Sequence, residues 1–242
     1  MTNFTNVDAD SLIYKCAYGD NVTNDMLKSR WNAKVEHIKV NTYADHLLVA
    51  IKGHGNFREA LDPEYKAHRK PQEPDMKRKL NWLAQYALEQ GAFQCDGWEA
   101  DDQVVAWAYE QDKRGDQYVI AAIDKDILQY PGNHYNYGGS VKKPIPEADR
   151  WVFTSPDEGW FRFCSQLITG DAVDNIKGIY RAGPARAKKE LTGLDKKGQL
   201  KAVIEMYKDE YKTDWERKLH VNCNLIYMRR FLEDEFIFGD HL

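Results

Sequence analysis

The stretch Gly97-Trp98-Glu99-Ala100-Asp101-Asp102-Gln103-Val104-Val105 places three carboxylates within four residues, directly before an apolar run. Acids in the first turn of a helix are favoured, because they face unpaired backbone N–H groups and the positive end of the helix dipole. Three anions this close also repel one another, so a cation would stabilise the cluster. Oxygen ligands suit a hard divalent ion such as Mg²⁺ or Mn²⁺. Taken alone, the cluster fits a solvated helix start as well as it fits a metal site.

Composition limits the class of protein. The chain has 242 residues, 43% of them hydrophobic and 30% charged, which suits one large domain, or one domain with an appendage, and a sizeable core. Its formal net charge of -4 does not indicate a polyanion binder, although local clusters of basic residues still can. The four cysteines lie far apart and lack the spacing of a zinc site. With no signal peptide and no apolar run long enough to cross a membrane, we expect a cytoplasmic protein with reduced thiols.

Predicted strands alternate with predicted helices on both sides of the acidic stretch. Strand patterns lie at residues 4–8, 46–51, 93–95, 118–123 and 151–153, and residues 135–139 suggest a further strand and a turn. This alternation predicts an α/β domain in which a largely parallel central sheet is flanked by helices. The loops after parallel strands gather into one crevice, and Asp8 and Asp124 each stand at the end of a predicted strand. Asp10 or Ser11 is predicted to cap the helix that follows.

Carboxylates recur at these strand ends and helix starts. The full set comprises Asp8, Glu99, Asp101, Asp102, Asp124, Asp126, Asp171 and Asp174. Their mutual repulsion creates affinity for cations, and in a metal-free protein it should raise the pKa of some of them. We therefore predict a divalent-metal site at this edge of the sheet.

Two stretches concentrate positive charge. The first, residues 66–79, is ordinarily a solvated helix face, and the alternative is a basic gateway for a phosphate backbone. The second, residues 170–189, predicts a helix, a glycine-rich turn and a second helix. Such a turn exposes backbone N–H groups at a helix N-terminus, which is a ready phosphate site.

This order of motifs resembles the 5′-nuclease superfamily, which includes flap endonucleases, the 5′-nuclease domains of bacterial DNA polymerases and bacteriophage 5′→3′ exonucleases. The resemblance runs from about Val7 to Lys189 and is strongest, in size and motif order, to a small phage exonuclease. Val7-Asp8 is similar to the first metal-ligand strand of the family, and residues 57–69 to the segment that leads into its helical arch. The acidic motifs at 99–102 and 124–126 resemble the central ones, and residues 170–184 resemble the helix-three-turn-helix that holds duplex DNA.

The resemblance implies an architecture and an activity. It implies a PIN-like nuclease domain at 1–169 with an arch at about 62–90, and a helical DNA-binding region at 170–242 with the helix-three-turn-helix at about 170–192. The implied enzyme is a metal-dependent 5′→3′ exonuclease or flap endonuclease, monomeric, acting in phage DNA replication or degradation in the host cytoplasm. Its implied partners are duplex DNA with a 5′ end or flap, or an RNA/DNA hybrid. The implied cofactors are two Mg²⁺ ions, with Mn²⁺ as a substitute, and K⁺ at the helix-three-turn-helix.

The implied chemistry is two-metal phosphodiester hydrolysis, in which ions roughly 3.5–4 Å apart activate water and stabilise the leaving oxygen. We assign Asp8, Glu99 and Asp101 to one ion and Asp124, Asp126 and Asp174 to the other. Asp102 and Asp171 are expected to act through water.

Further roles follow from the same resemblance. Lys66 and Arg69 are expected to contact the scissile phosphate from the arch and to stabilise charge that develops there. Tyr65 is expected to stack on an unpaired base. The remaining DNA contacts are expected from Lys70, Lys177, Gly178, Arg181, Gly183, Arg186, Lys188 and Lys189.

Two positions depart from the family pattern. Lys52 stands after the second strand, where relatives usually carry an aspartate, and we expect its ammonium to pair with Asp8 or Glu99. Arg181 stands where the turn usually has a glycine, so a phosphate contact is gained while a close backbone approach is given up. Two other classes remain open at this point: a PIN-like ribonuclease, and a non-catalytic DNA-binding relative.

Overall fold

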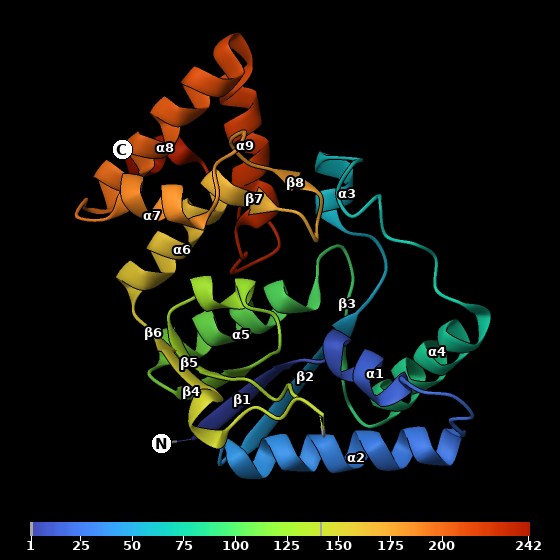
Figure 1. Ribbon diagram of the computed structural model, residues 1–242. Coiled ribbons are helices and arrows are strands. Elements are labelled where there is room, and N and C mark those ends of the chain that lie inside the picture. Colours follow the sequence, from blue (N-terminus) through green and yellow to red (C-terminus); the bar gives the residue numbers. More distant parts are fainter. Residues whose placement is uncertain (1, 141) are drawn as a thin grey trace.

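The computed structural model describes residues 2–140 and 142–242, and a six-stranded sheet lies at its centre (Figure 1). The strands are β1 (Asn3–Asp8), β2 (His46–Lys52), β3 (Phe93–Cys95), β4 (Gln117–Ala121), β5 (Gly132–Tyr135) and β6 (Trp151–Thr154). Their order across the sheet is β3-β2-β1-β4-β5-β6, with parallel pairing except between β5 and β6. The predicted α/β fold with a largely parallel sheet is confirmed.

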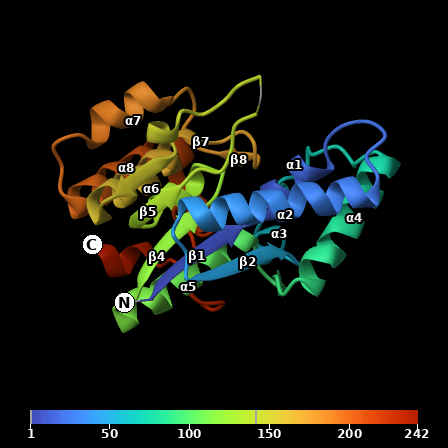
Figure 2. The ribbon, with the colours of Figure 1, turned by 90° about the horizontal axis from the view of Figure 1, so that it is seen from below.

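Alternating side chains bury both faces of the sheet. The helices of this part are α1 (Asp10–Ala17), α2 (Asn24–Asn41), α3 (Phe57–Leu61), α4 (Pro74–Glu89) and α5 (Ala100–Arg114). Val7 and Ile51 pack in the core with α1, α2 and α4, whereas Ala50 and Ile120 pack on α5. Figures 1 and 2 show α2 covering one face of the sheet and α5 the other.

A second core lies in the C-terminal helices, which Figure 1 shows beyond α5 in yellow, orange and red. They are α6 (Pro156–Thr169), α7 (Pro184–Leu191), α8 (Lys196–Tyr211) and α9 (Trp215–Ile226). Short 3₁₀ turns occupy Asp126–Gln129, Glu147–Asp149, Lys212–Asp214 and Phe238–His241. Leu167 of α6 belongs to this second core together with Val203 and Leu219. The predicted division at residue 169 therefore falls at the end of a helix that packs with the C-terminal region.

The segment after α6 is a β-hairpin, so the helix predicted to begin at residue 170 is wrong. Strand β7 (Gly170–Asp171) pairs antiparallel with β8 (Ile176–Lys177). Gly170 has a φ of 67°, and a Cβ at this position would lie 2.3 Å from the carbonyl oxygen of Ile176. Only glycine permits both this left-handed conformation and this close approach, and that ends the helix.

The segment predicted as an arch, residues 62–90, comprises a turn, an extended link and α4. Helix α4 buries Leu83 and Ala87 in the core that it shares with α1 and α2. All four cysteines are free and buried. In the described part of the chain, no helix is both long and apolar enough to cross a membrane.

Candidate active site

The parallel register brings acid-bearing segments to one edge of the sheet. Asp8 pairs with Ala50 of β2, and Val7 pairs with Ala121 of β4, so the three strands end near one another at the same edge of the sheet. Asp124 follows β4 closely, and Glu99 is the N-cap of α5, where it forms a capping box with Asp102. The strand ends and the helix start thus deliver their carboxylates to one place, as the sequence predicts.

A small cavity of about 50 Å³ lies beside Glu99 and Asp124, whereas Asp8 and Asp102 do not line it. Its polar lining is Arg58, Tyr65, Lys66, Arg69, Glu99, Asp101, Asp124, Asp126, Gln166 and Asp174. These residues come from α3 and the turn after it, from α5, from the β4 end, from α6 and from the β7–β8 turn. Most of the predicted metal and arch residues are therefore neighbours in space.

Asp8 and Asp101 form an acidic group without ion-pair partners. Burial raises the pKa of Asp8 to about 8, and the charges of Asp10, Asp124 and Glu99 add to the effect. Burial, followed by the charges of Asp102 and Glu99, holds the pKa of Asp101 well above its usual range. A divalent cation held by oxygen ligands would relieve this repulsion, so the donor set fits Mg²⁺ or Mn²⁺.

Asp124, Asp126 and Asp171 form a second acidic group. Asp124 Oδ1 accepts a hydrogen bond from the backbone N–H of Asp126 at 3.0 Å. Burial raises the pKa of Asp126 to about 7, with the charge of Asp124 and a hydrogen bond to Asp171 adding to it. Asp126 and Asp171 also line a neighbouring groove with Lys188. Asp171 therefore stands beside the predicted second-ion ligands.

Glu99 and Asp174 are held by cations from the turn after α3. Lys66 Nζ lies 2.5 Å from Glu99 Oε1 and 3.3 Å from Asp174 Oδ2, and Arg69 Nη2 lies 2.6 Å from Asp174 Oδ1. Although burial opposes it, the charges of Arg58 and Lys66 lower the pKa of Glu99. Lys66 adopts a left-handed φ of 56°, and its N–H donates to the Asp174 carbonyl at 2.9 Å.

The ion pairs of Lys66 and Arg69 with Glu99 and Asp174 occupy oxygens that a metal ion would need. Within residues 2–140 and 142–242, no three His, Cys, Asp or Glu side chains stand in position to hold an ion together. For Glu99 and Asp174 to act as ligands, Lys66 and Arg69 would have to release their oxygens.

Asp102 has a structural role in this arrangement, which corrects its prediction as a metal ligand through water. Its side chain is 0% exposed, and it receives both Nη1 of Arg58 at 2.5 Å and Nη2 at 3.0 Å. The backbone N–H groups of Glu99 and Arg229 donate to the same carboxylate. All of its acceptor sites face protein donors. No role is predicted for Arg58 from the sequence. An arginine in a short helix near an acidic motif could have suggested an ion pair with Asp102.

Tyr65 is also placed differently from its prediction as a stacking platform for a base. Its ring is buried, at 5% exposure, in the core of the C-terminal helices. Its hydroxyl donates to Glu99 Oε2 at 2.8 Å and lies 3.1 Å from Asp174 Oδ2. Tyr65 therefore positions these two carboxylates and has no free ring face to offer.

The expected pairing of Lys52 with Asp8 or Glu99 is wrong. The Lys52 side chain is exposed, and in the described residues it takes part in no ion pair of 4 Å or less. Its backbone N–H donates to Asp10 Oδ1 at 2.6 Å. Asp10 itself is not the cap of α1, because the N-cap position belongs to Ala9, and this helix start has no side-chain cap. The Asp10 carboxylate instead lies near those of Asp8 and Glu99.

The predicted DNA-contacting residues beyond β7 form an exposed basic surface. The exposed side chains on it are Lys177, Arg181, Arg186, Lys188 and Lys189. Arg181 has a φ of 54°, a conformation that glycine adopts most easily. Gly178 passes so close to β7 that a Cβ would lie 2.3 Å from the Gly170 nitrogen, and Gly183 is the N-cap of α7. Lys70 is exposed in the link before α4.

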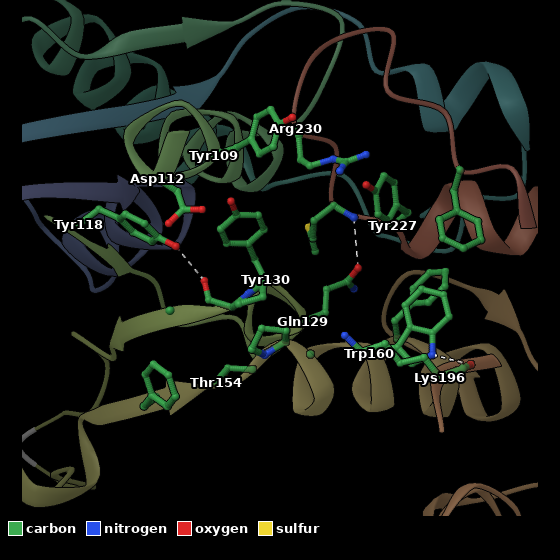
Figure 3. Close-up of a pocket in the computed structure, with 18 residues that line it drawn as sticks. Tyr109, Asp112, Tyr118, Gln129, Tyr130, Thr154, Trp160, Lys196, Tyr227 and Arg230 are labelled. Carbon is green, nitrogen blue, oxygen red and sulfur yellow. Dashed lines mark hydrogen bonds between the residues drawn. The ribbon is translucent and has the colours of Figure 1, made fainter. Parts of the chain in front are cut away.

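A larger cavity of about 550 Å³ lies elsewhere, between α5, β6 and the C-terminal helices (Figure 3). Tyr118, Tyr130, Trp160 and Tyr227 give it an aromatic lining, with Arg230 beside them. Among the described residues that line it, none belongs to the predicted site. The acidic crevice, by which we mean the cavity of about 50 Å³ and the carboxylates around it, is the candidate site because of its charged groups, although its volume is smaller.

Comparison with known proteins gives both sequence and structural matches. Residues 3–143 match the family model described as 5′-3′ exonuclease, N-terminal resolvase-like domain. DNA polymerase I of Rhizobium leguminosarum is 30% identical over 155 residues, 62% of this chain and 15% of the polymerase. The thermostable DNA polymerase I of Thermus aquaticus is 27% identical over 215 residues, 82% of this chain and 24% of the polymerase. This chain therefore spans a quarter or less of the length of these two relatives.

Two solved structures share the fold across nearly the whole chain. A bacteriophage T5 protein co-crystallised with metal ions gives a TM-score of 0.74 at 16% identity, covering 95% of this chain and 91% of that one. A bacteriophage T5 flap endonuclease in a pseudo-enzyme-product complex with DNA and metal ions gives 0.70 at 18% identity, covering 95% and 90%. At this identity the likeness establishes the fold, including its C-terminal helices.

Proposed function

The chain belongs to the 5′-3′ exonuclease family, and we propose that it hydrolyses DNA phosphodiester bonds at 5′ ends or flaps with two divalent metal ions. The membership of the 5′-nuclease superfamily expected from the motif order is thereby confirmed. Mg²⁺ is the proposed ion, with Mn²⁺ as a substitute, and phage DNA replication or degradation is the proposed setting. This setting is proposed because the two solved structures described above, which share the fold, are bacteriophage T5 proteins.

One observation supports the metal-dependent chemistry above all others. Asp8 is buried and Asp101 and Asp126 are half-buried at one edge of the sheet, all without ion-pair partners in the described residues, and the pKa values of Asp8 and Asp126 are raised to about 8 and about 7. A carboxylate cluster that serves only as a surface is solvated and has no reason to be buried with its charges unpaired. When bound, divalent ions supply charge neutralisation of the phosphate and a more acidic attacking water.

The protein's own residues supply orientation and positive charge. Tyr65 fixes Glu99 and Asp174 by hydrogen bonds, so two of the proposed ligands are oriented before any ion binds. Lys66 and Arg69 stand at the cavity, and once they release these carboxylates they can contact a scissile phosphate and stabilise its developing charge.

The exposed basic surface supports the proposed grip on duplex DNA. Lys177, Arg181, Arg186, Lys188 and Lys189 make no ion pair of 4 Å or less in the described chain, so their charges are free for phosphates. Lys188 borders the groove that contains Asp126 and Asp171, which connects this surface to the acidic crevice. Contacts of this kind are independent of base sequence. A K⁺ ion at the turn before α7 belongs to the same proposal.

A cleavage assay tests the proposal and its competitors together. The purified chain is incubated with 5′-labelled duplex DNA, flap DNA, an RNA/DNA hybrid and single-stranded RNA, with Mg²⁺ or with EDTA. Mg²⁺-dependent release from the 5′ end or flap of DNA is the expected result. Cleavage restricted to single-stranded RNA would favour a ribonuclease, and tight DNA binding without any cleavage would favour a non-catalytic relative.

A further inference from the structure

The end of β2 has no carboxylate of its own. The strand closes at Lys52, whose exposed side chain offers an ammonium and no oxygen. The neighbouring strand β1 ends at Asp8, and Asp10 follows it at the first position of α1. Asp10 Oδ1 accepts the backbone N–H of Lys52 at 2.6 Å, so its carboxylate reaches across to the end of β2.

Asp10 is also tied to Asp8. Asp8 Oδ1 accepts the backbone N–H of Asp10 at 3.2 Å, and the two carboxylates repel each other. The two contacts together place Asp10 between the ends of β1 and β2, beside Glu99. The backbone N–H of Lys52 in β2 therefore orients the Asp10 side chain.

The carboxylates at this edge fall into two classes. Glu99, Asp102 and Asp174 each have a lysine or arginine within 4 Å. Asp8, Asp10 and Asp101 have no such partner within the described residues. Three carboxylates near one another therefore have no cation at ion-pair distance, whereas their neighbours do.

We propose that Asp10 is a carboxylate ligand of the ion assigned to Asp8, Glu99 and Asp101, at the strand end where Lys52 offers none. This inference rests on the proposed function, because it concerns the same metal site. It adds a residue that lies outside the set predicted from the sequence. An aspartate in the first turn of a helix is favourable in itself, so the test must separate a ligand from a helix-start residue.

The substitution Asp10→Asn distinguishes a metal ligand from a residue that only stabilises the start of α1. The asparagine side-chain oxygen can still accept the Lys52 N–H, while the charge is removed. Asp96→Asn is the matched control, because Asp96 Oδ1 accepts the backbone N–H of His54 at 2.8 Å just beyond the same strand. The Asp96 side chain is 65% exposed, and its carboxylate lies 3.3 Å from His54 Nδ1.

The measurement is Mn²⁺ binding to the full chain by isothermal titration calorimetry, without DNA. A metal-contacting carboxylate should matter at least as much as an outer partner, whose loss weakens affinity about 10- to 100-fold, so Asp10→Asn should weaken one Mn²⁺ site at least about 10-fold. Asp96→Asn should bind Mn²⁺ as the wild type does. In EDTA, Asp10→Asn should melt at the same or a higher temperature than the wild type, because a repelling charge is gone.

Each contrary outcome has one meaning. Unchanged Mn²⁺ affinity in a folded Asp10→Asn protein would overturn the role of Asp10 and leave the proposed function intact. A wild type that binds no Mn²⁺ would overturn the metal-dependent function together with this inference. If Asp10→Asn did not fold, as judged by circular dichroism, Asp10→Ser would be titrated in its place, and the same loss is expected of it.

Discussion

Replacement of Arg58 by alanine should destabilise the metal-free protein strongly. Arg58 is 1% exposed and makes four hydrogen bonds: two to Asp102, one to the Leu225 carbonyl and one to the Tyr227 carbonyl. It therefore joins α3, α5 and the end of α9 at one point. The substitution leaves Asp102 as a fully buried carboxylate without a cation.

The magnitude follows from that unpaired charge. Removal of one partner of a buried ion pair costs about 3–5 kcal/mol, a large share of the roughly 5–15 kcal/mol that stabilises a protein. For a chain of this size, about 2–4 °C is lost per kcal/mol, so the melting temperature should fall by about 6–20 °C. Thermal unfolding followed by circular dichroism in EDTA measures this shift.

The chain offers a matched control for the same geometry on the surface. Arg217 makes a two-point ion pair with Asp214, but the side chains are 64% and 45% exposed. Arg217→Ala should cost no more than about 1 kcal/mol, because exposed ion pairs are screened by water. If Arg58→Ala were as mild as Arg217→Ala, the structural role of Asp102 would be refuted, and its assignment as a metal ligand would return.

Three further predictions concern charge at the site. Lys66→Met should lower the cleavage rate at saturating DNA, measured in single turnover, more than it lowers the affinity for DNA. The double variant Lys188→Ala with Lys189→Ala should instead weaken DNA binding, and a salt titration should show its salt slope reduced by about one for each phosphate that the protein no longer neutralises. If both variants lost only affinity, the proposed role of Lys66 would be contradicted. Lys52→Ala should change the Mg²⁺ concentration for half-maximal cleavage only slightly, because its ammonium forms no ion pair of 4 Å or less in the described residues and acts on Asp10 at longer range. A large shift of that midpoint would place the ammonium in direct contact with the proposed metal ligands. The pKa of Asp8 is raised from 3.8 to about 8, so between these two pH values the folded state binds more protons than the unfolded state. The stability of the metal-free protein should therefore fall as pH rises through this window, by up to about 1.4 kcal/mol per pH unit. Mg²⁺ should raise the melting temperature more at pH 8 than at pH 5, and the same rise at both pH values would contradict this.

The fold could be predicted from the sequence because its strongest signals are local. Val7, Ile51 and Ile120 stand in short apolar runs that end in polar residues, and helical patterns separate them. That alternation indicates parallel strands, and parallel strands place their following acids at one edge. The amino-acid sequence alone therefore predicts that Asp8 and Asp124 meet.

The misassigned residues depend on contacts that no local pattern encodes. Asp102 and Asp101 are adjacent in sequence, yet Arg58 pairs with one and leaves the other unpaired, and this depends on where the fold places Arg58 of α3. Tyr65 belongs to a basic segment but is buried by helices that lie roughly a hundred residues or more further along the chain. Asp10 resembles a helix cap until the pairing of β1 with β2 brings the amide of Lys52 to its oxygen.

Asp124→Asn tests the central claim most directly. The change removes one charge at the end of β4 and keeps an oxygen that can accept the Asp126 N–H. With Mg²⁺ and 5′-labelled flap DNA, we predict that turnover falls by orders of magnitude, while DNA binding measured in Ca²⁺ stays at the wild-type level. Cleavage at the wild-type rate by this variant would contradict the two-metal account of the acidic crevice.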